Sequence, residues 1–150
     1  MYYNYKQYFS IVLLALVDAD NRSIYVDMGC NGIISDGGVF ANSYICKAIE
    51  VKSLNLPNWK LLPLPGRENP LPYVFVGDEA FPPKTYLLRP YPSRQSDLSR
   101  RIFNYRLWRA RRVVENVFGI LASRFTVFKS TIDMDPEKAQ KIVLAFCALQ

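Results

Sequence analysis

The most informative segment of the sequence is Val74-Phe75-Val76-Gly77-Asp78-Glu79-Ala80-Phe81-Pro82. Its first residues are β-branched or aromatic, which is typical of a short buried strand. The strand ends in the carboxylate of Asp78, and the prolines after Phe81 prevent a helix from starting at once. The sequence therefore predicts an acidic side chain at the end of a buried strand.

A second acid, Glu115, stands alone in the most basic part of the chain. From Lys84 to Arg124 there are ten Lys or Arg against two acids, a net charge of +8, whereas the whole chain carries +6. Such a concentration of positive charge is expected of a surface that meets a polyanion. The alternative is a solvated helix face, but acids are too scarce here for i,i+4 pairing to neutralise it. Binding a divalent cation against a phosphate would explain the isolated Glu115.

Composition limits the classes of protein and site. The chain has 150 residues, half of them apolar, which fits one domain over residues 1–150. The absence of histidine excludes Ser-His-Asp and Cys-His catalysis and histidine-bound zinc, so any metal must use oxygen ligands. Three scattered cysteines indicate reduced thiols of an intracellular protein. The apolar run from Phe9 to Val17 is too short to span a membrane, and we expect no membrane partner.

Hydrophobic periodicity predicts an α/β or α+β order of elements. We expect a hairpin from Tyr8–Val17 and Ser23–Met28, a helix over Val39–Val51, a proline-rich loop over Leu54–Pro72, a strand at Tyr73–Val76, a helix from after Ser96 to about Ser123, a short extended piece at Phe125–Ile132 and a final helix capped by Asp135. In the long basic helix the expected apolar stripe is Leu98, Ile102, Tyr105, Val113, Val117 and Leu121.

The two acids suit metal-dependent phosphodiester cleavage. Such cleavage needs carboxylates from separate elements that converge on divalent cations. Asp78 at a strand end and Glu115 on a helix meet this requirement in kind. The arginines expected to hold a nucleic-acid backbone are Arg100, Arg101, Arg106, Arg109, Arg111 and Arg112.

Four motifs in order carry a family resemblance over essentially the whole chain. They are Phe9 to Asp18 (FSIVLLALVD), Gly29 to Phe40 (GCNGIISDGGVF), Gly77 to Pro82 (GDEAFP) and Arg109 to Leu121 (RARRVVENVFGIL). Together they resemble the DDE superfamily nuclease domain of Harbinger/PIF-type transposases and their domesticated nuclease relatives. The resemblance implies an RNase H-like mixed sheet flanked by helices, Mg²⁺ or Mn²⁺ as cofactor, DNA as partner and a nuclear location.

The resemblance also assigns roles to single residues. It places the second catalytic aspartate of the family on Asp78 and the final glutamate on Glu115, and it gives Asp36 a supporting role at the site. The alternatives stay open: Asp78 as a turn acid after a strand, Glu115 in an ion pair with Arg111 or Arg112, and Asp36 as a helix cap or turn residue. No helix-turn-helix is recognisable, so a separate DNA-binding protein is expected to choose the target.

One departure from the family bears on activity. The first catalytic aspartate of the family lies in an Asp-Gly-Thr type motif on a strand upstream of Tyr8–Val17, and residues 1–7 contain no acid. That strand is central in an RNase H-like sheet, so we expect this chain to be inactive and marginally stable alone. Two hypotheses follow: a truncated nuclease, or a domesticated module that binds DNA or a protein without cleaving. Whether the chain is an enzyme is left open.

Overall fold

A two-stranded hairpin lies at the centre of the molecule. The computed structural model describes residues 9–31, 34–54, 56, 71–92, 94 and 97–150, without the side chains of residues 30 and 31. Strands β1 (Ile11–Val17) and β2 (Ser23–Asn31) pair antiparallel. At their turn, the Asp18 Oδ1 atom accepts hydrogen bonds from the backbone N–H groups of Asp20 and Arg22, each at 2.9 Å. The predicted hairpin is confirmed.

Four helices, a 3₁₀ turn and a second pair of strands account for most of the remaining described residues. The helices are α1 (Asp36–Asn42), α2 (Tyr44–Glu50), α3 (Leu98–Arg124) and α4 (Pro136–Ala148), and the 3₁₀ turn is η2 (Thr126–Lys129). Strands β3 (Phe75–Val76) and β4 (Leu87–Leu88) pair parallel and form a sheet separate from the hairpin. Among the described helices none is long and apolar enough to cross a membrane.

The single helix predicted over Val39–Val51 is wrong, because Ser43 divides it. The Ser43 backbone is extended (φ −65°, ψ 152°) and ends α1. Its hydroxyl donates to the Phe40 carbonyl at 2.6 Å and accepts from the Cys46 N–H at 3.2 Å, so the same side chain begins α2. Helix α1 also starts earlier than predicted, because the Ser35 hydroxyl caps it.

Two further predictions need correction or lie outside the description. The extended piece predicted at Phe125–Ile132 is wrong, because η2 forms there and Phe125 stacks on Phe146 of α4 at a centroid distance of 4.2 Å. Strand β4 was not predicted, since two residues are too few to show a period. Most of the predicted loop Leu54–Pro72 lies outside the described residues.

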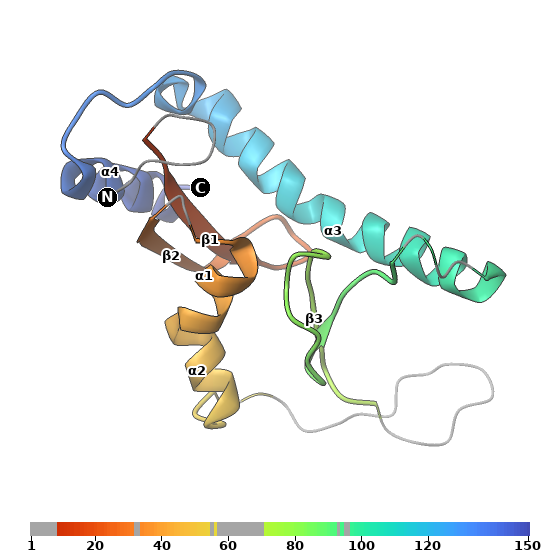
Figure 1. Cartoon of the computed structure of the whole chain (residues 1–150). Coiled ribbons are helices and arrows are strands. Elements are labelled where there is room, and N and C mark those ends of the chain that lie inside the picture. Colours follow the sequence, from red (N-terminus) through yellow and green to blue (C-terminus); the bar gives the residue numbers. More distant parts are fainter. Residues whose placement is uncertain (1–8, 32–33, 55, 57–70, 93, 95–96) are drawn as a thin grey trace.

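Helices cover both faces of the hairpin. Leu14 and Leu16 of β1 pack against a core formed by Phe40, Ile45, Cys46, Ile49 and Leu87. Leu13 and Val17 point to the other face, where they pack against Val117, Leu121, Val143 and Cys147. This alternation along one strand places α1 and α2 on one side and α3 and α4 on the other (Figure 1). The protein is therefore a mixed α/β domain, as predicted.

Helix α3 confirms the predicted long helix but not the whole of its apolar stripe. Leu98, Ile102 and Tyr105 are exposed by 71%, 45% and 57%, whereas Val117 and Leu121 are buried. The reason is geometric: eight residues separate Tyr105 from Val113, and at 3.6 residues per turn this spacing moves the stripe about 80° around the axis. Figure 1 shows the first half of α3 running out beyond the hairpin.

Candidate catalytic groove

A groove between β1 and β3 brings together the three acids singled out in the sequence. Its volume is about 290 Å³, and Asp36, Asp78 and Glu115 all line it. Asp36 lies in the first turn of α1, Asp78 is the second residue after β3, and Glu115 lies in the middle of α3. The rest of the lining is largely apolar and includes Val12, Leu14 and Leu16 of β1, Phe40, Ile45 and Ile49 of α1 and α2, and Phe75, Val76 and Leu87.

A tight turn fixes Asp78 at the end of β3. The Asp78 carbonyl accepts a hydrogen bond from the Phe81 N–H at 3.1 Å. Arg89 closes this turn from outside, because its Nη1 atom donates to the carbonyl oxygens of Glu79 at 3.3 Å and Phe81 at 3.1 Å. This role could not be predicted from the sequence, since Arg89 is one of many cations in the basic segment.

Asp78 forms an ion pair across the groove. The Arg111 Nη2 atom lies 2.8 Å from Asp78 Oδ2, with side-chain exposures of 22% for Arg111 and 49% for Asp78. The other carboxylate oxygen, Oδ1, accepts from the Glu79 backbone N–H. Asp78 is thus a turn acid, as the alternative interpretation held, and also faces the groove. Its charge is balanced by an arginine of α3.

Glu115 does not form the ion pair that the alternative interpretation assigned to it. Among the ion pairs of the described residues, none includes Glu115. Arg111, one turn earlier, binds Asp78 instead, and the Arg112 guanidinium lies over the Trp108 ring at 5.5 Å from its centroid. Glu115 is therefore an exposed acid at the edge of the groove.

Asp36 enters the groove because α1 packs closely on the turn after Asp78. A Cβ atom on Gly37 would lie 2.6 Å from the Ala80 carbonyl oxygen, so this approach requires glycine. Asp36 is not the helix cap that the alternative interpretation made it. The Ser35 hydroxyl accepts a hydrogen bond from the Gly38 N–H, so Ser35 is the N-cap of α1. As an acid in the first turn, Asp36 is favourably placed in the helix dipole.

The groove has oxygen donors suited to magnesium but too few of them. Carboxylates of Asp78 and Glu115 are ligands that Mg²⁺ prefers. Within the described residues, however, no three Asp, Glu or Cys side chains lie close enough together to hold a metal ion. Arg111 also occupies one Asp78 oxygen. As placed, the described acids do not form a complete cluster of metal ligands.

The six arginines predicted to bind nucleic acid divide into two groups. Arg111 is committed to Asp78, and Arg100 lies over the Tyr91 ring with its Nε atom 3.9 Å from Asp97. The exposed members are Arg101, Arg106, Arg109 and Arg112. They do not all share one face, because the step of five residues from Arg101 to Arg106 corresponds to about 140° around the helix.

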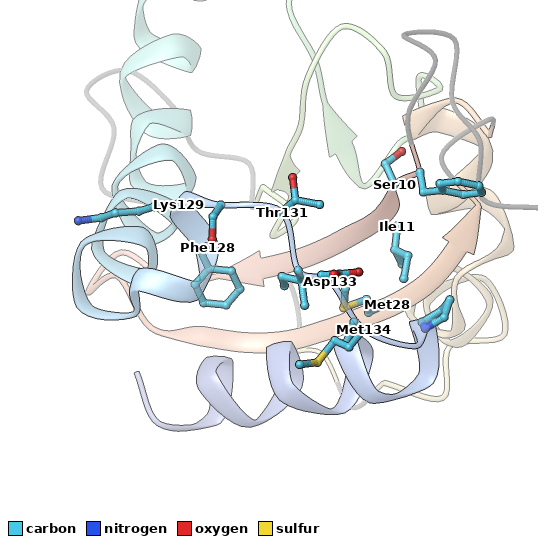
Figure 2. A pocket seen from close by; sticks show the side chains of 13 residues that line it. Ser10, Ile11, Met28, Phe128, Lys129, Thr131, Asp133 and Met134 are labelled. Atoms are coloured by element: carbon cyan, nitrogen blue, oxygen red, sulfur yellow. The ribbon is translucent and has the colours of Figure 1, made fainter.

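A second, wider groove lies at the other end of the hairpin and has no comparable set of acids. Its volume is about 1330 Å³. Figure 2 shows Ile11 and Met28 of the hairpin facing the segment before α4, which carries Phe128, Asp133 and Met134. None of the predicted site residues lines it. Of these two grooves, it is the one between β1 and β3 that is lined by the acids singled out in the sequence.

The chain is similar to a known protein family and to a curated protein. A family model described as a DDE superfamily endonuclease matches residues 1–150. A protein of Arabidopsis thaliana described as "Protein ALP1-like" is 32% identical over 142 residues, which is 94% of this chain and 34% of that protein. The chain thus spans about a third of the length of this curated relative. No solved structure matches the chain.

Proposed function

Because the chain belongs to the DDE superfamily endonuclease family, we propose that the groove between β1 and β3 is a site of divalent-metal-dependent DNA cleavage. The observation that carries this proposal is the convergence of Asp36, Asp78 and Glu115, from three separate elements, on one groove. Within the family we assign the chain to the Harbinger/PIF-type nucleases, on the four ordered motifs.

Asp78 and Glu115 are the proposed ligands of Mg²⁺ or Mn²⁺. When bound, such ions stabilise charge on the attacking and leaving oxygens of a phosphodiester. Asp36 supports the site from α1, at the position that the close contact of Gly37 with Ala80 fixes. Arg111 balances Asp78 in the form described, and it would compete with a cation for the Oδ2 atom of that carboxylate.

We further propose an RNase H-like sheet that includes one more strand, between β1 and β3. In the described part, β1 pairs only with β2 and β3 only with β4, so each has an unmatched edge along the apolar groove. Unpaired buried backbone groups cost about 1 to 3 kcal/mol each. The added strand would also bring a third carboxylate. On this account the 150 residues alone are inactive and marginally stable.

DNA is the proposed substrate, and the exposed arginines of α3 are its proposed contacts. Arg101, Arg109 and Arg112 are exposed and lie on the same helix as Glu115. Contacts of this kind hold the phosphate backbone without reading its sequence. A separate DNA-binding protein would then choose the target, and the nucleus is the proposed location.

The test is nicking of supercoiled plasmid by the chain extended with the genomic sequence immediately upstream of Met1. We expect nicking that depends on Mg²⁺ or Mn²⁺ and disappears in Asp78→Asn and in Glu115→Gln. Asp133→Asn in the second groove is the matched control and retains activity. Nicking that persists in both groove variants would refute the proposal.

A second candidate is a domesticated module that binds DNA, or a protein partner, without cleaving. It is favoured by the Arg111–Asp78 ion pair and by the lack of a three-acid cluster among the described residues. This candidate predicts salt-dependent DNA affinity that falls in the triple variant Arg109→Ala, Arg111→Ala and Arg112→Ala. It also predicts no nicking with any metal, even in the extended chain.

A further inference from the structure

Two aromatic and two cationic side chains form a stripe on the exposed side of α3. Arg101, Tyr105, Trp108 and Arg112, here called the α3 stripe, are spaced by four, three and four residues, so they lie on one side of the helix over three turns. Tyr105 and Trp108 are stacked, with ring centroids 6.4 Å apart and an interplanar angle of 28°. The Arg112 guanidinium lies 5.5 Å from the Trp108 centroid.

Both rings of the α3 stripe are exposed to solvent. Tyr105 is 57% and Trp108 48% exposed. Neither belongs to the two cores of the described residues. The core side of this part of the helix is instead occupied by Leu107, which is buried. Tyr105 and Trp108 therefore contribute surface to the solvent face, where a ligand can reach them.

The positive charge around the α3 stripe indicates which class of ligand it fits. Between Asp97 and Glu115 the helix carries six arginines and no acid. An apolar protein partner would bury several of these cations without counterions, at high cost. A polyanion with flat apolar groups would instead satisfy both the cations and the rings. Single-stranded nucleic acid has this combination of phosphates and unpaired bases.

We propose that the α3 stripe binds unpaired bases of single-stranded DNA, by stacking on Trp108 and Tyr105 while Arg101 and Arg112 contact the adjacent phosphates. The choice of DNA over RNA rests on the proposed function. Glu115 follows Trp108 by seven residues, which is two helical turns or about 10.5 Å along the same side of the helix. A strand held on the stripe would therefore lie next to the candidate groove.

The experiment measures binding of labelled oligothymidylate by fluorescence anisotropy, in EDTA. Trp108→Ala is expected to weaken binding about ten-fold, within the range for loss of one stacked base. Trp108→Phe, which keeps a ring, should retain most of the affinity. Tyr44→Ala is the matched control, because Tyr44 is an exposed aromatic residue (73%) on a different helix, and it should bind like the unchanged chain. Circular dichroism checks that each variant is folded.

A second readout reports stacking directly. The chain has two tryptophans, and in a Trp59→Phe background Trp108 is the remaining one. We expect oligothymidylate to quench its fluorescence and an abasic oligonucleotide of equal length to leave it unchanged. Duplex DNA of the same length should bind more weakly than the single strand.

Several results would overturn the proposal. Equal binding of the abasic strand or of duplex DNA would show that bases do not stack on the helix. Tighter binding of an equal RNA strand would assign the stripe to RNA. Self-association that Trp108→Ala abolishes would assign it to a second copy of the chain. Because all measurements are made without metal, a failure of the nuclease proposal would leave oligonucleotide binding unaffected, and the two failures remain distinguishable.

Discussion

At the scale of single residues, Arg89 and Arg111 show that not all of the basic segment is available to a polyanion. The Arg89 guanidinium donates hydrogen bonds to two backbone carbonyls of the turn after β3, and Arg111 forms an ion pair with Asp78. Both arginines therefore hold the acidic turn in place. Of the six arginines predicted to bind nucleic acid, Arg101, Arg106, Arg109 and Arg112 of α3 are exposed.

Replacing Arg89 by methionine should destabilise the chain although it removes only one cation. Two carbonyl oxygens lose a charged donor, and a hydrogen bond to a charged group contributes about 1.5 to 3 kcal/mol. We expect a lower free energy of unfolding in urea by about that amount. Arg109→Met, at an exposed position of α3, is the control and should change stability by less than about 0.5 kcal/mol. Equal effects of the two changes would contradict the bracing role of Arg89.

At the scale of elements, the close packing of α1 on the turn after Asp78 depends on Gly37. A Gly37→Ala change would place Cβ against the Ala80 carbonyl, and relieving the clash should cost about 1 to 3 kcal/mol of unfolding free energy. Gly119→Ala on α3 is the matched control, because a Cβ there meets nothing within 4 Å. It should instead stabilise by about 0.5 to 1 kcal/mol. Chemical denaturation of both variants decides the matter, and two changes of the same sign would contradict this account.

Helices and strands were predictable from the sequence where the hydrophobic pattern runs over many residues. They were poorly predictable where a single side-chain contact sets the end of an element. The hairpin and α3 have enough residues to show a period, and both were predicted. The break at Ser43 depends on a single side chain that ends one helix and caps the next. The apolar residues in the first half of α3 looked like core, because a sequence does not show where the sheet under a helix ends.

The acids of the candidate site could be predicted from the sequence, but the ion pair that one of them forms could not. Asp78 and Glu115 stand out locally, as an acid after an apolar run and an acid among arginines. That Arg111 binds Asp78, 33 residues away, could not be read from a segment with ten similar cations. Long-range partners are set by how the elements pack, and no spacing in the chain encodes them.

At the scale of the whole molecule, stability should decline in alkali. Burial raises the pKa of the Cys147 thiol above its ordinary value of 9.0 and the pKa values of the Tyr25 and Tyr86 hydroxyls above 10.0. The unfolded chain therefore loses these protons at a lower pH than the folded chain. The contribution of these groups to the free energy of unfolding is fully present below about pH 9 and falls as the pH rises further.

Urea unfolding between about pH 8 and about pH 11, under reducing conditions, measures this decline. Tyr86→Phe removes one hydroxyl without leaving a large cavity, and its curve should be shallower above the ordinary tyrosine pKa of 10.0. A stability that stays constant over this range, or a decline of equal slope in Tyr86→Phe, would contradict the assignment.

On the proposed function, Asp78 and Glu115 bind one divalent cation together, in competition with Arg111. The affinity of the chain for Mn²⁺ tests this, with the free ion measured by electron paramagnetic resonance. We predict weaker binding in Asp78→Asn and in Glu115→Gln, tighter binding in Arg111→Gln, and no change in Asp133→Asn. Equal affinity in all four variants, or a loss in Asp133→Asn as large as in Asp78→Asn, would contradict the account.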